Sequence, residues 1–182
     1  MFQKILSTII FIFLLPLFII ISFLILFFDG RPIFYKQNRI GKNNKIFKMY
    51  KYRTMLNGVG DIPTSHVVDA GSMLTNTGKL IRKYSIDEFP QLINVIIGDM
   101  NFIGYRPCLP NEFELIKFTK KYKLHDYKPG MTGWAQINGR DKITVEEKSL
   151  LDAYYYFNRS IFLDIRIFVV TIYVVLFKKD IS

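Results

Sequence analysis

Cysteine is nearly absent from the sequence: the only one is Cys108, which excludes an internal disulfide. A cytosolic or cytosol-facing location is therefore the default expectation. Histidine is also scarce, and His66 and His125 are far apart in the sequence. With a single cysteine, these two histidines do not have the spacing of a zinc site, so we do not expect a structural zinc centre.

Acidic residues are outnumbered by basic ones, 15 against 25, which leaves a net charge of +10. This excess indicates an anionic partner, either nucleic acid, acidic lipid headgroups or a phosphorylated substrate. Hydrophobic residues make up 50% of the chain, and basic charge beside so much apolar area favours a membrane surface over a soluble nucleic-acid binder. The length of 182 residues allows one domain with a modest core.

Charge is absent from residues 5–28, which are almost wholly apolar and long enough to span a bilayer as a helix. A signal peptide does not fit, because the apolar stretch is too long and no small-residue cleavage site follows it. Pro16 removes one helical hydrogen bond, so we expect a kink with other protein packed close to it. The basic residues that follow place the rest of the chain in the cytoplasm. Spanning and re-entrant helices are both compatible with this pattern.

Residues 33–55 have the pattern of a β-hairpin, because β-favouring residues flank a Gly-Lys-Asn-Asn turn that tolerates positive φ. Residues 57–78 are rich in Gly, Ser, Thr, Asn and Pro, which predicts a long loop. Residues 167–177 are too short to span a bilayer and predict an interfacial or buried helix. Further helices are predicted over residues 79–83, 86–97, 111–122 and 145–157.

Two adjacent carboxylates, Asp87 and Glu88, stand out in this basic chain at a predicted helix start. Ser85 and Glu88 have the spacing of a capping box, in which each side chain satisfies a backbone N–H of the other residue. This interpretation does not account for Asp87. In the first turn of a helix, free N–H groups and the helix dipole favour an anion, so a catalytic role for Asp87 is the alternative.

Three motifs occur in order: FYKQNRIGKNNKIFKMYKYRTM, then GKLIRKYSIDEFPQLINVIIGDMNFIGYRP, then PGMTGWAQINGR. With these motifs the chain resembles the bacterial sugar transferases, and among them the small monotopic polyprenyl-phosphate phosphoglycosyl transferases. The resemblance extends from the apolar N-terminus to the segment LDAYYYFNRSIFLDIRIFVVT, so it covers nearly the whole chain.

The resemblance implies an enzyme that transfers a sugar-1-phosphate from a UDP-sugar to undecaprenyl phosphate and releases UMP, the first membrane step of glycan assembly. In this family an Asp-Glu dyad is catalytic, Mg2+ is required, and the Asp carries a covalent phosphosugar. The matching residues here are Asp87 and Glu88. The short form with GWAQINGRD resembles members that use N-acetylated amino sugars, so we expect such a donor.

Arg106 is the main candidate for phosphate binding, because the family's Gly-Pro-Arg-Pro motif falls on residues 104–107, with Tyr105 in place of the first proline. Arg106 can bind a phosphate through two parallel hydrogen bonds, whereas a structural salt bridge is its usual alternative role. Asp99 is a second candidate metal ligand beside Asp87, although Gly-Asp is equally a turn signal. Lys51 and Arg53 alternate on the predicted second strand and so share a face, which makes both candidates for binding the phosphate of a headgroup or nucleotide. The other candidates for binding phosphate or substrate are Arg82, Gln136 and Arg140.

Together these features predict an α+β protein that is mostly helical with a small β-hairpin. Residues 1–30 are expected to form a re-entrant membrane helix with a break near Pro16. Residues 31–182 are expected to form a catalytic domain with a C-terminal interfacial helix, on the cytosolic face of the bacterial inner membrane.

Two other classes of function are alternatives. A membrane-anchored basic scaffold could bind acidic lipids without catalysis. A nucleic-acid module would use the interleaved aromatic and basic residues of KMYKYRT, but the apolar anchor and the acidic helix start argue against it. Nucleic acid is therefore not an expected partner, and the sequence leaves the oligomeric state open.

Overall fold

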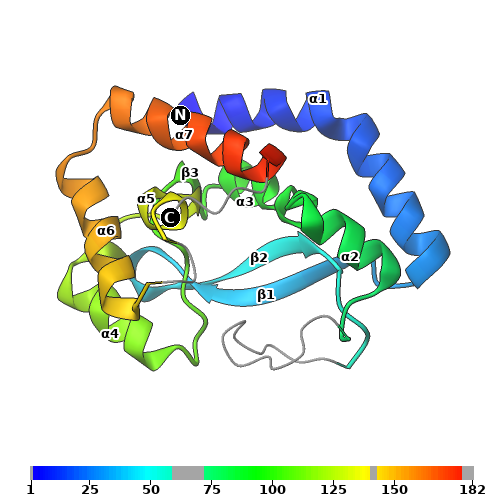
Figure 1. Cartoon of the computed structure of the whole chain (residues 1–182), viewed down its shortest axis with the longest axis horizontal. Coiled ribbons are helices and arrows are strands. Elements are labelled where there is room, and N and C mark those ends of the chain that lie inside the picture. Colours follow the sequence, from blue (N-terminus) through cyan, green and yellow to red (C-terminus); the bar gives the residue numbers. More distant parts are fainter. Residues whose placement is uncertain (1, 59–71, 140–142, 178–182) are drawn as a thin grey trace. The chain divides into compact units, whose positions relative to one another are not determined.

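The structure is a computed structural model that describes residues 2–58, 72–139 and 143–177 (Figure 1). The chain divides into two compact units, each with helices and part of a β-hairpin, and the predicted α+β class is confirmed. The first unit comprises Met1–Gln37 and Lys48–Ile97, and the second comprises Asn38–Phe47 and Gly98–Ser182.

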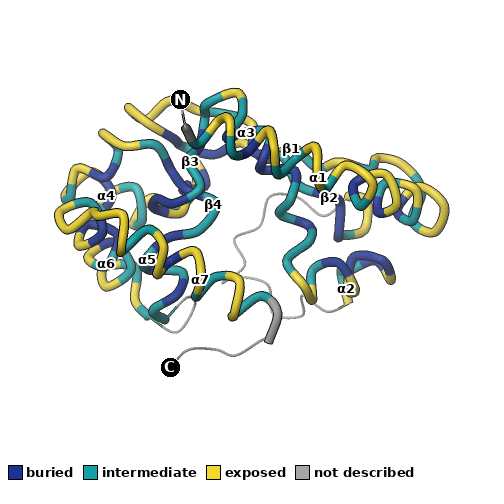
Figure 2. Tube along the Cα trace, turned by 90° about the horizontal axis from the view of Figure 1, so that it is seen from above, coloured by how far each residue is buried: buried dark blue, intermediate teal, exposed yellow. Residues whose placement is uncertain are grey.

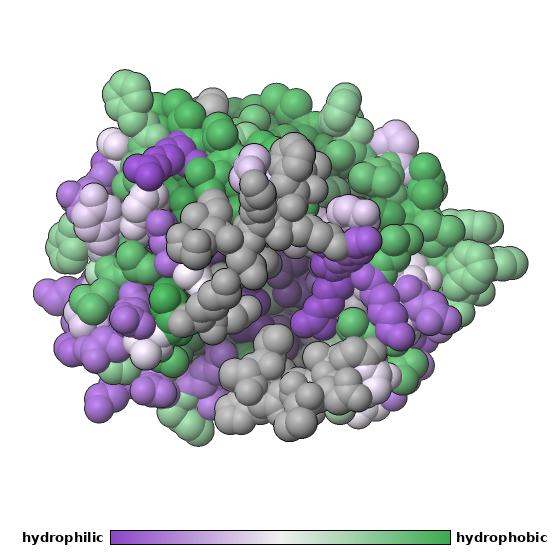
Figure 3. Space-filling view, in the orientation of Figure 1, coloured by the Kyte–Doolittle hydropathy of each residue, from purple (hydrophilic) through white to green (hydrophobic). Residues whose placement is uncertain are grey.

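The first unit begins with a long apolar helix, α1 (Phe2–Leu24), which continues as a π-helical turn over Ile25–Asp29. By length and composition, Gln3–Asp29 is the one helix within the described residues that is suited to cross a membrane. Many of its large side chains are exposed, with Phe13 at 82%, and most of α1 is coloured exposed or intermediate in Figure 2. The surface over α1 is correspondingly hydrophobic (Figure 3).

Helix α1 contains Pro16 and is bent rather than interrupted (Figure 1). The chain stays helical through this residue, and Figure 1 shows α1 bending part-way along its length. Phe18, two residues further on, is buried against the ring of Tyr52, whose hydroxyl donates to the Phe18 carbonyl oxygen at 3.1 Å. The prediction that other protein packs close to the bend is confirmed, and the re-entrant topology stays a prediction.

The predicted hairpin is confirmed. Strands β1 (Phe34–Ile40) and β2 (Ile46–Tyr52) form a two-stranded sheet, and a 3-10 turn over Lys42–Asn44 joins them. Asn43 and Asn44 have φ values of 55° and 59°, the left-handed conformation that asparagine tolerates. The turn end of the hairpin belongs to the second unit and the open end to the first.

Two short helices, α2 (Asn76–Lys83) and α3 (Gln91–Ile97), complete the first unit. α2 begins before the predicted start because the Thr75 hydroxyl caps it by accepting the Gly78 N–H at 2.9 Å. A Cβ at Gly78 would collide with a neighbouring backbone carbonyl, so only glycine fits there. The predicted loop is therefore shorter than expected at its C-terminal end, and its residues 59–71 lie outside the described residues.

The second unit combines helices with a short parallel sheet. Strand β3 (Asn101–Ile103) pairs with β4 (Gly130–Thr132), with Asn101 opposite Gly130. The sequence does not predict these strands, because three residues are too few to show a periodic pattern. The helical segments are α4 (Phe113–Lys121), a 3-10 turn (Leu124–Asp126), α5 (Trp134–Ile137), α6 (Val145–Phe157) and α7 (Ile161–Phe177).

Helix α6 confirms its prediction. A C-terminal helix is also confirmed, but α7 begins at Ile161, before the predicted residues 167–177, and its interfacial position stays a prediction. Thr144 caps α6 in a reciprocal capping box with Glu147, so the helix begins where the sequence places it. In α7 one side is buried and another is exposed: Ile167 is fully buried, whereas Phe162 is 86% exposed. The core around Ile167 contains Ile103, Ile137 and Tyr155.

Candidate active site

Asp87 and Glu88 lie in a short 3-10 turn between α2 and α3. Ser85 has a left-handed conformation with φ 54° and ψ 21°, and its side chain makes no capping hydrogen bond. The predicted capping box is therefore wrong, and so is the predicted single helix over residues 86–97. The capping box fails because the backbone of Ser85 is left-handed. The helix begins later than predicted because Pro90 has no N–H and is suited to the start of a helix, so α3 begins immediately after it.

The side chain of Asp87 is buried, with 7% of the residue exposed. The pKa of its carboxyl is raised to about 6, mainly by burial and secondly by the charge of Glu88, while the charges of Lys51 and Arg82 lower it. The structure thus brings four of the predicted site residues together. A desolvated carboxylate with two cations nearby is an arrangement that can offset its repulsion from an anionic substrate.

Glu88 is held by an ion pair with the hairpin. The Nζ of Lys51, on β2, lies 2.7 Å from the Oε1 of Glu88, and both side chains are mostly shielded from solvent. Lys51 is a predicted phosphate ligand, and in this structure its ammonium group contacts the catalytic candidate instead. The ion pair joins strand β2 to the turn that carries Asp87.

Asn94 makes a second connection between β2 and the segment after the dyad. Its side-chain oxygen accepts the Tyr50 N–H at 3.0 Å, and its side-chain nitrogen donates to the Lys48 carbonyl oxygen at 2.8 Å. Asn94 is fully buried on α3. Backbone groups of the single strand β2 therefore supply the hydrogen-bond partners that both ends of this buried amide need. Sequence reasoning missed this residue, and a lone polar side chain within the apolar LINVII segment is the signal that was available.

Arg53, a predicted phosphate ligand, caps the end of the apolar helix. It is buried just beyond β2, and its guanidinium donates to the carbonyl oxygens of Asp29, Gly30 and Arg31 at 2.6, 2.7 and 2.8 Å. A further hydrogen bond of 2.8 Å goes to the side-chain oxygen of Asn57. These contacts give Arg53 a structural role, and no contact among them favours phosphate binding.

The other predicted site residues belong to the second unit. Arg106 is exposed within residues 103–109, which are otherwise buried, and its side chain makes no hydrogen bond or ion pair with any described residue. Gln136 lies on α5, and both polar atoms of its side chain are buried without a partner among the described residues. Asp99 lies in the bend after α3. Arg140 lies outside the described residues.

Close backbone packing holds the segment that precedes Arg106. The Gly104 N–H donates to the Thr132 carbonyl oxygen at 2.9 Å, and the Gly130 N–H donates to the Tyr105 carbonyl oxygen at 2.9 Å. A Cβ at either glycine would collide with the opposite backbone, so these approaches require glycine. Tyr105, the departure from the family motif, is buried in a small core cluster that includes a residue of α6.

The described residues contain no group of three or more His, Cys, Asp or Glu side chains that is suited to a metal ion. Mg2+ does not need such a cage, since proteins commonly bind it through one or two carboxylates together with substrate phosphates. The adjacent carboxylates of Asp87 and Glu88 offer the hard oxygen donors that this ion prefers. The donor set therefore fits Mg2+ bound jointly with a phosphorylated substrate.

Comparisons with known proteins show which family the chain belongs to. Residues 1–178 match the family model described as bacterial sugar transferase. The chain belongs to this family. This bacterial sugar transferase is 45% identical over 156 residues to the uncharacterized sugar transferase EpsL of Bacillus subtilis (strain 168). The match covers 84% of this chain and 74% of that protein.

Two other relatives have names that state a reaction. The chain is 36% identical over 167 residues to the UDP-N-acetylgalactosamine-undecaprenyl-phosphate N-acetylgalactosaminephosphotransferase of Aeromonas hydrophila, covering 88% of this chain and 39% of that protein. It is 34% identical over 167 residues to the undecaprenyl-phosphate galactose phosphotransferase of Salmonella typhimurium, covering 84% of this chain and 35% of that protein. The chain thus spans well under half the length of these two relatives.

Proposed function

We propose that this bacterial sugar transferase moves a sugar-1-phosphate from a UDP-sugar to undecaprenyl phosphate and releases UMP, as a first membrane step of glycan assembly. The names of the Aeromonas and Salmonella relatives support this class of reaction. The observation that carries the proposal is the buried carboxylate of Asp87 beside Glu88, Lys51 and Arg82. An N-acetylated amino sugar is the donor group that we propose to test first.

The reaction proceeds in two displacements at one phosphorus atom. In the first, a carboxylate oxygen of Asp87 attacks the sugar-bearing phosphorus of the UDP-sugar, and UMP leaves with the bridging oxygen. In the second, a phosphate oxygen of undecaprenyl phosphate attacks the same phosphorus, and the bond to the Asp87 oxygen breaks. The products are the lipid-linked diphosphosugar and the regenerated carboxylate.

The surroundings of Asp87 suit this nucleophile. A raised pKa makes the ionised carboxylate more basic than an exposed aspartate, and hence a stronger nucleophile. Lys51 and Arg82 favour its ionised form, so the carboxylate is not simply neutralised by burial. Arg106 is the proposed ligand of the donor diphosphate, because its exposed guanidinium makes no hydrogen bond or ion pair with other described residues.

Mg2+ is the proposed cofactor. Asp87 would hold the ion together with substrate phosphates, Glu88 offers an adjacent oxygen donor, and Asp99 stays the second predicted ligand. When bound, the ion would neutralise charge on the diphosphate and on the leaving group.

A re-entrant α1 on the cytosolic face of the inner membrane completes the proposal. The Nζ of Lys4, in the first turn of α1, donates to the carbonyl oxygen of Ile97 at 3.3 Å. At the other end, the Arg53 guanidinium binds three carbonyls that follow the apolar helix. Contacts of both ends with the same unit support a helix that enters and leaves the membrane on one face.

The experiment compares wild type with Asp87→Asn, using purified protein in detergent, undecaprenyl phosphate, Mg2+ and a panel of UDP-sugars. Wild type should release UMP with at least one donor, and Asp87→Asn should release none, because the amide keeps the shape but is not a nucleophile. Asp126→Asn, at an exposed position in the second unit, is the matched control and should stay active. Near wild-type release by a folded Asp87→Asn variant would overturn the mechanism, and an inactive wild type would favour the scaffold alternative.

A further inference from the structure

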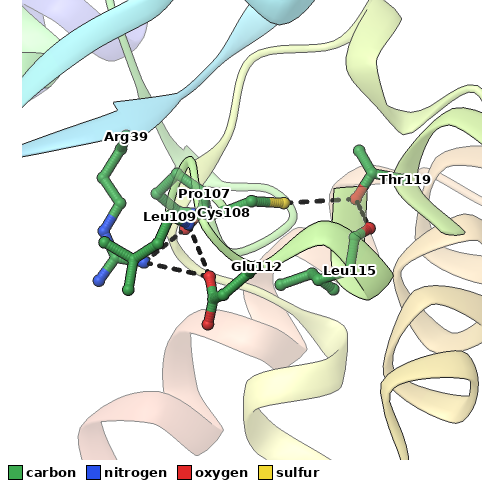
Figure 4. A network of polar contacts seen from close by, with 7 residues as sticks. All are labelled: Arg39, Pro107, Cys108, Leu109, Glu112, Leu115 and Thr119. Atoms are coloured by element: carbon green, nitrogen blue, oxygen red, sulfur yellow. Dashed lines mark hydrogen bonds and ion pairs between the residues drawn. The ribbon is translucent and has the colours of Figure 1, made fainter. Parts of the chain in front are cut away.

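Arg106 is presented to solvent on a buried and tightly bonded segment of the second unit. Every other residue between 103 and 109 is buried, so the backbone on both sides of this exposed cation is enclosed by protein. The preceding residues are fixed by strand β4, as described above. Among the side chains that contact the residues that follow are two to which the proposed reaction assigns no role, Arg39 and Glu112 (Figure 4). Thr119 also contacts this segment, with its Oγ1 at 3.5 Å from the Sγ of Cys108.

Arg39, near the end of β1, holds the backbone immediately after Arg106. Its Nη1 donates to the Pro107 carbonyl oxygen at 2.9 Å, and the next residue of the strand, Ile40, donates its N–H to the Cys108 carbonyl oxygen at 2.9 Å. Only 7% of Arg39 is exposed. A hydrogen bond from a buried guanidinium to a carbonyl is among the stronger ones in proteins, because the donor is charged.

Glu112 completes this arrangement from the other side. Its Oε2 accepts the Leu109 N–H at 2.6 Å and lies 3.8 Å from the Nη1 of Arg39. The backbone of Glu112 also donates to the Leu109 carbonyl oxygen at 3.1 Å, so residues 109–112 form a closed turn. Three consecutive residues after Arg106 are thus bonded, and the buried charge of Arg39 is compensated by the carboxylate.

We propose that Arg39 and Glu112 are positioning residues that fix the Pro107–Leu109 backbone and thereby hold the guanidinium of Arg106 ready for the donor diphosphate. This inference rests on the proposed function, in which Arg106 binds that diphosphate. The Nη1 of Arg39 and the Oε2 of Glu112 are directed at the segment itself, so the proposal includes no contact of either residue with the substrate (Figure 4). A side chain held in its binding geometry loses less conformational entropy when the substrate arrives.

A purely structural role for the same two residues predicts something different. A buried ion pair that only stabilises the fold would, when broken, lower the stability of the whole second unit and leave substrate affinity unchanged in the folded fraction. A positioning role predicts faster local opening of residues 107–112 and a selective rise in the KM for the UDP-sugar.

The test uses the full-length protein with Arg39→Gln, Arg39→Lys and Glu112→Gln. Arg159→Gln is the matched control, because Arg159 also pairs with a carboxylate at 3.8 Å, that of Asp164, in the same unit. Hydrogen exchange of the peptide over residues 103–112 is measured by mass spectrometry, and KM and kcat for the UDP-sugar are measured from UMP release.

We expect Arg39→Gln to speed exchange of this peptide and to raise the KM roughly 10- to 100-fold with a smaller change in kcat. Arg39→Lys should lie between Arg39→Gln and wild type, and Arg159→Gln should match wild type in both readouts.

If Arg39→Gln does not fold, Glu112→Gln carries the same test, because it removes the charge while keeping an acceptor for Leu109. Unchanged exchange overturns the inference, as does faster exchange with an unchanged KM. Absence of UMP release by wild type overturns the proposed function instead, and the exchange result still decides whether the segment is held by Arg39.

Discussion

The Nζ of Lys51 and the Oε1 of Glu88 lie 2.7 Å apart, and this ion pair joins the hairpin to the turn that carries Asp87. Lys51→Met should therefore disturb the site more than the fold. It removes a charge that lowers the pKa of Asp87 and leaves Glu88 without this partner, and we expect kcat/KM for UMP release to fall roughly 10- to 100-fold. Lys48→Met, at an exposed position on the same strand, should stay near wild type. Equal losses in the two variants would mean that only the total charge of the hairpin matters.

Arg53→Met should lower stability rather than act on the chemistry directly. The substitution leaves the carbonyl oxygens of Asp29, Gly30 and Arg31 without their guanidinium donor, and we expect a loss of about 2–3 kcal/mol, seen as a lower Tm in detergent. Arg31→Met is the matched control, because it removes the same charge from an exposed side chain and keeps the backbone carbonyl. Lost activity with an unchanged Tm in Arg53→Met would instead support the phosphate-binding role first predicted from the sequence.

Asp152→Asn should make stability less dependent on pH. Burial raises the pKa of the Asp152 carboxyl to about 8, although the Ala135 backbone N–H and the charge of Lys148 lower it. Between the ordinary aspartate pKa near 4 and pH 8, the folded state keeps a proton that the unfolded state has lost. Folding stability in wild type should therefore fall as pH rises through this window, with a slope approaching about 1.4 kcal/mol per pH unit.

The measurement is the Tm of wild type and Asp152→Asn between pH 5 and pH 8.5. The amide cannot titrate but can still accept the Ala135 N–H, so the advantage of the variant should grow with pH. Asp126→Asn, at an exposed position, should follow wild type at every pH. A constant difference between Asp152→Asn and wild type across the range would show that Asp152 is ionised in the folded protein.

The N-terminus should lie on the cytosolic side of the membrane if α1 is re-entrant. A Gln3→Cys variant in a Cys108→Ser background can be probed with a membrane-impermeant thiol reagent on intact cells and on inverted vesicles. Cys108 is buried, so the Cys108→Ser background serves only as a precaution against labelling of this thiol in unfolded protein. We expect labelling in inverted vesicles alone. Labelling on intact cells would mean that the helix spans the membrane.

Local sequence patterns predicted those elements whose cause is local. Asn43 and Asn44, which tolerate positive φ, predicted the hairpin turn. The helix over residues 145–157 is preceded by its own cap at Thr144. The capping box at Ser85 is wrong because the left-handed backbone of that residue turns the chain before the acidic pair. The spacing of a capping box, Ser-x-x-Glu at Ser85 and Thr-x-x-Glu at Thr144, therefore occurs with different structures, depending on the backbone conformation of its first residue.

The supporting contacts of the site were beyond sequence reasoning because they join residues far apart in the chain. Arg39 contacts Pro107, and Lys51 contacts Glu88, at separations of 68 and 37 positions. A lysine or arginine in a basic hairpin is indistinguishable by pattern from its solvated neighbours. Arg53 illustrates the same point, since its alternation with Lys51 indicated a shared face, whereas its guanidinium caps the apolar helix.

Covalent catalysis by Asp87 is the central claim, and trapping the intermediate tests it most directly. The protein is mixed with its UDP-sugar and Mg2+ without undecaprenyl phosphate, quenched rapidly in acid, digested and analysed by mass spectrometry. We predict that the peptide containing Asp87 gains the mass of one phosphosugar, that Asp87→Asn shows no adduct, and that undecaprenyl phosphate added before the quench removes it. An active enzyme that releases UMP only when the lipid acceptor is present, with no adduct at Asp87, would contradict the account and indicate direct transfer between the two substrates.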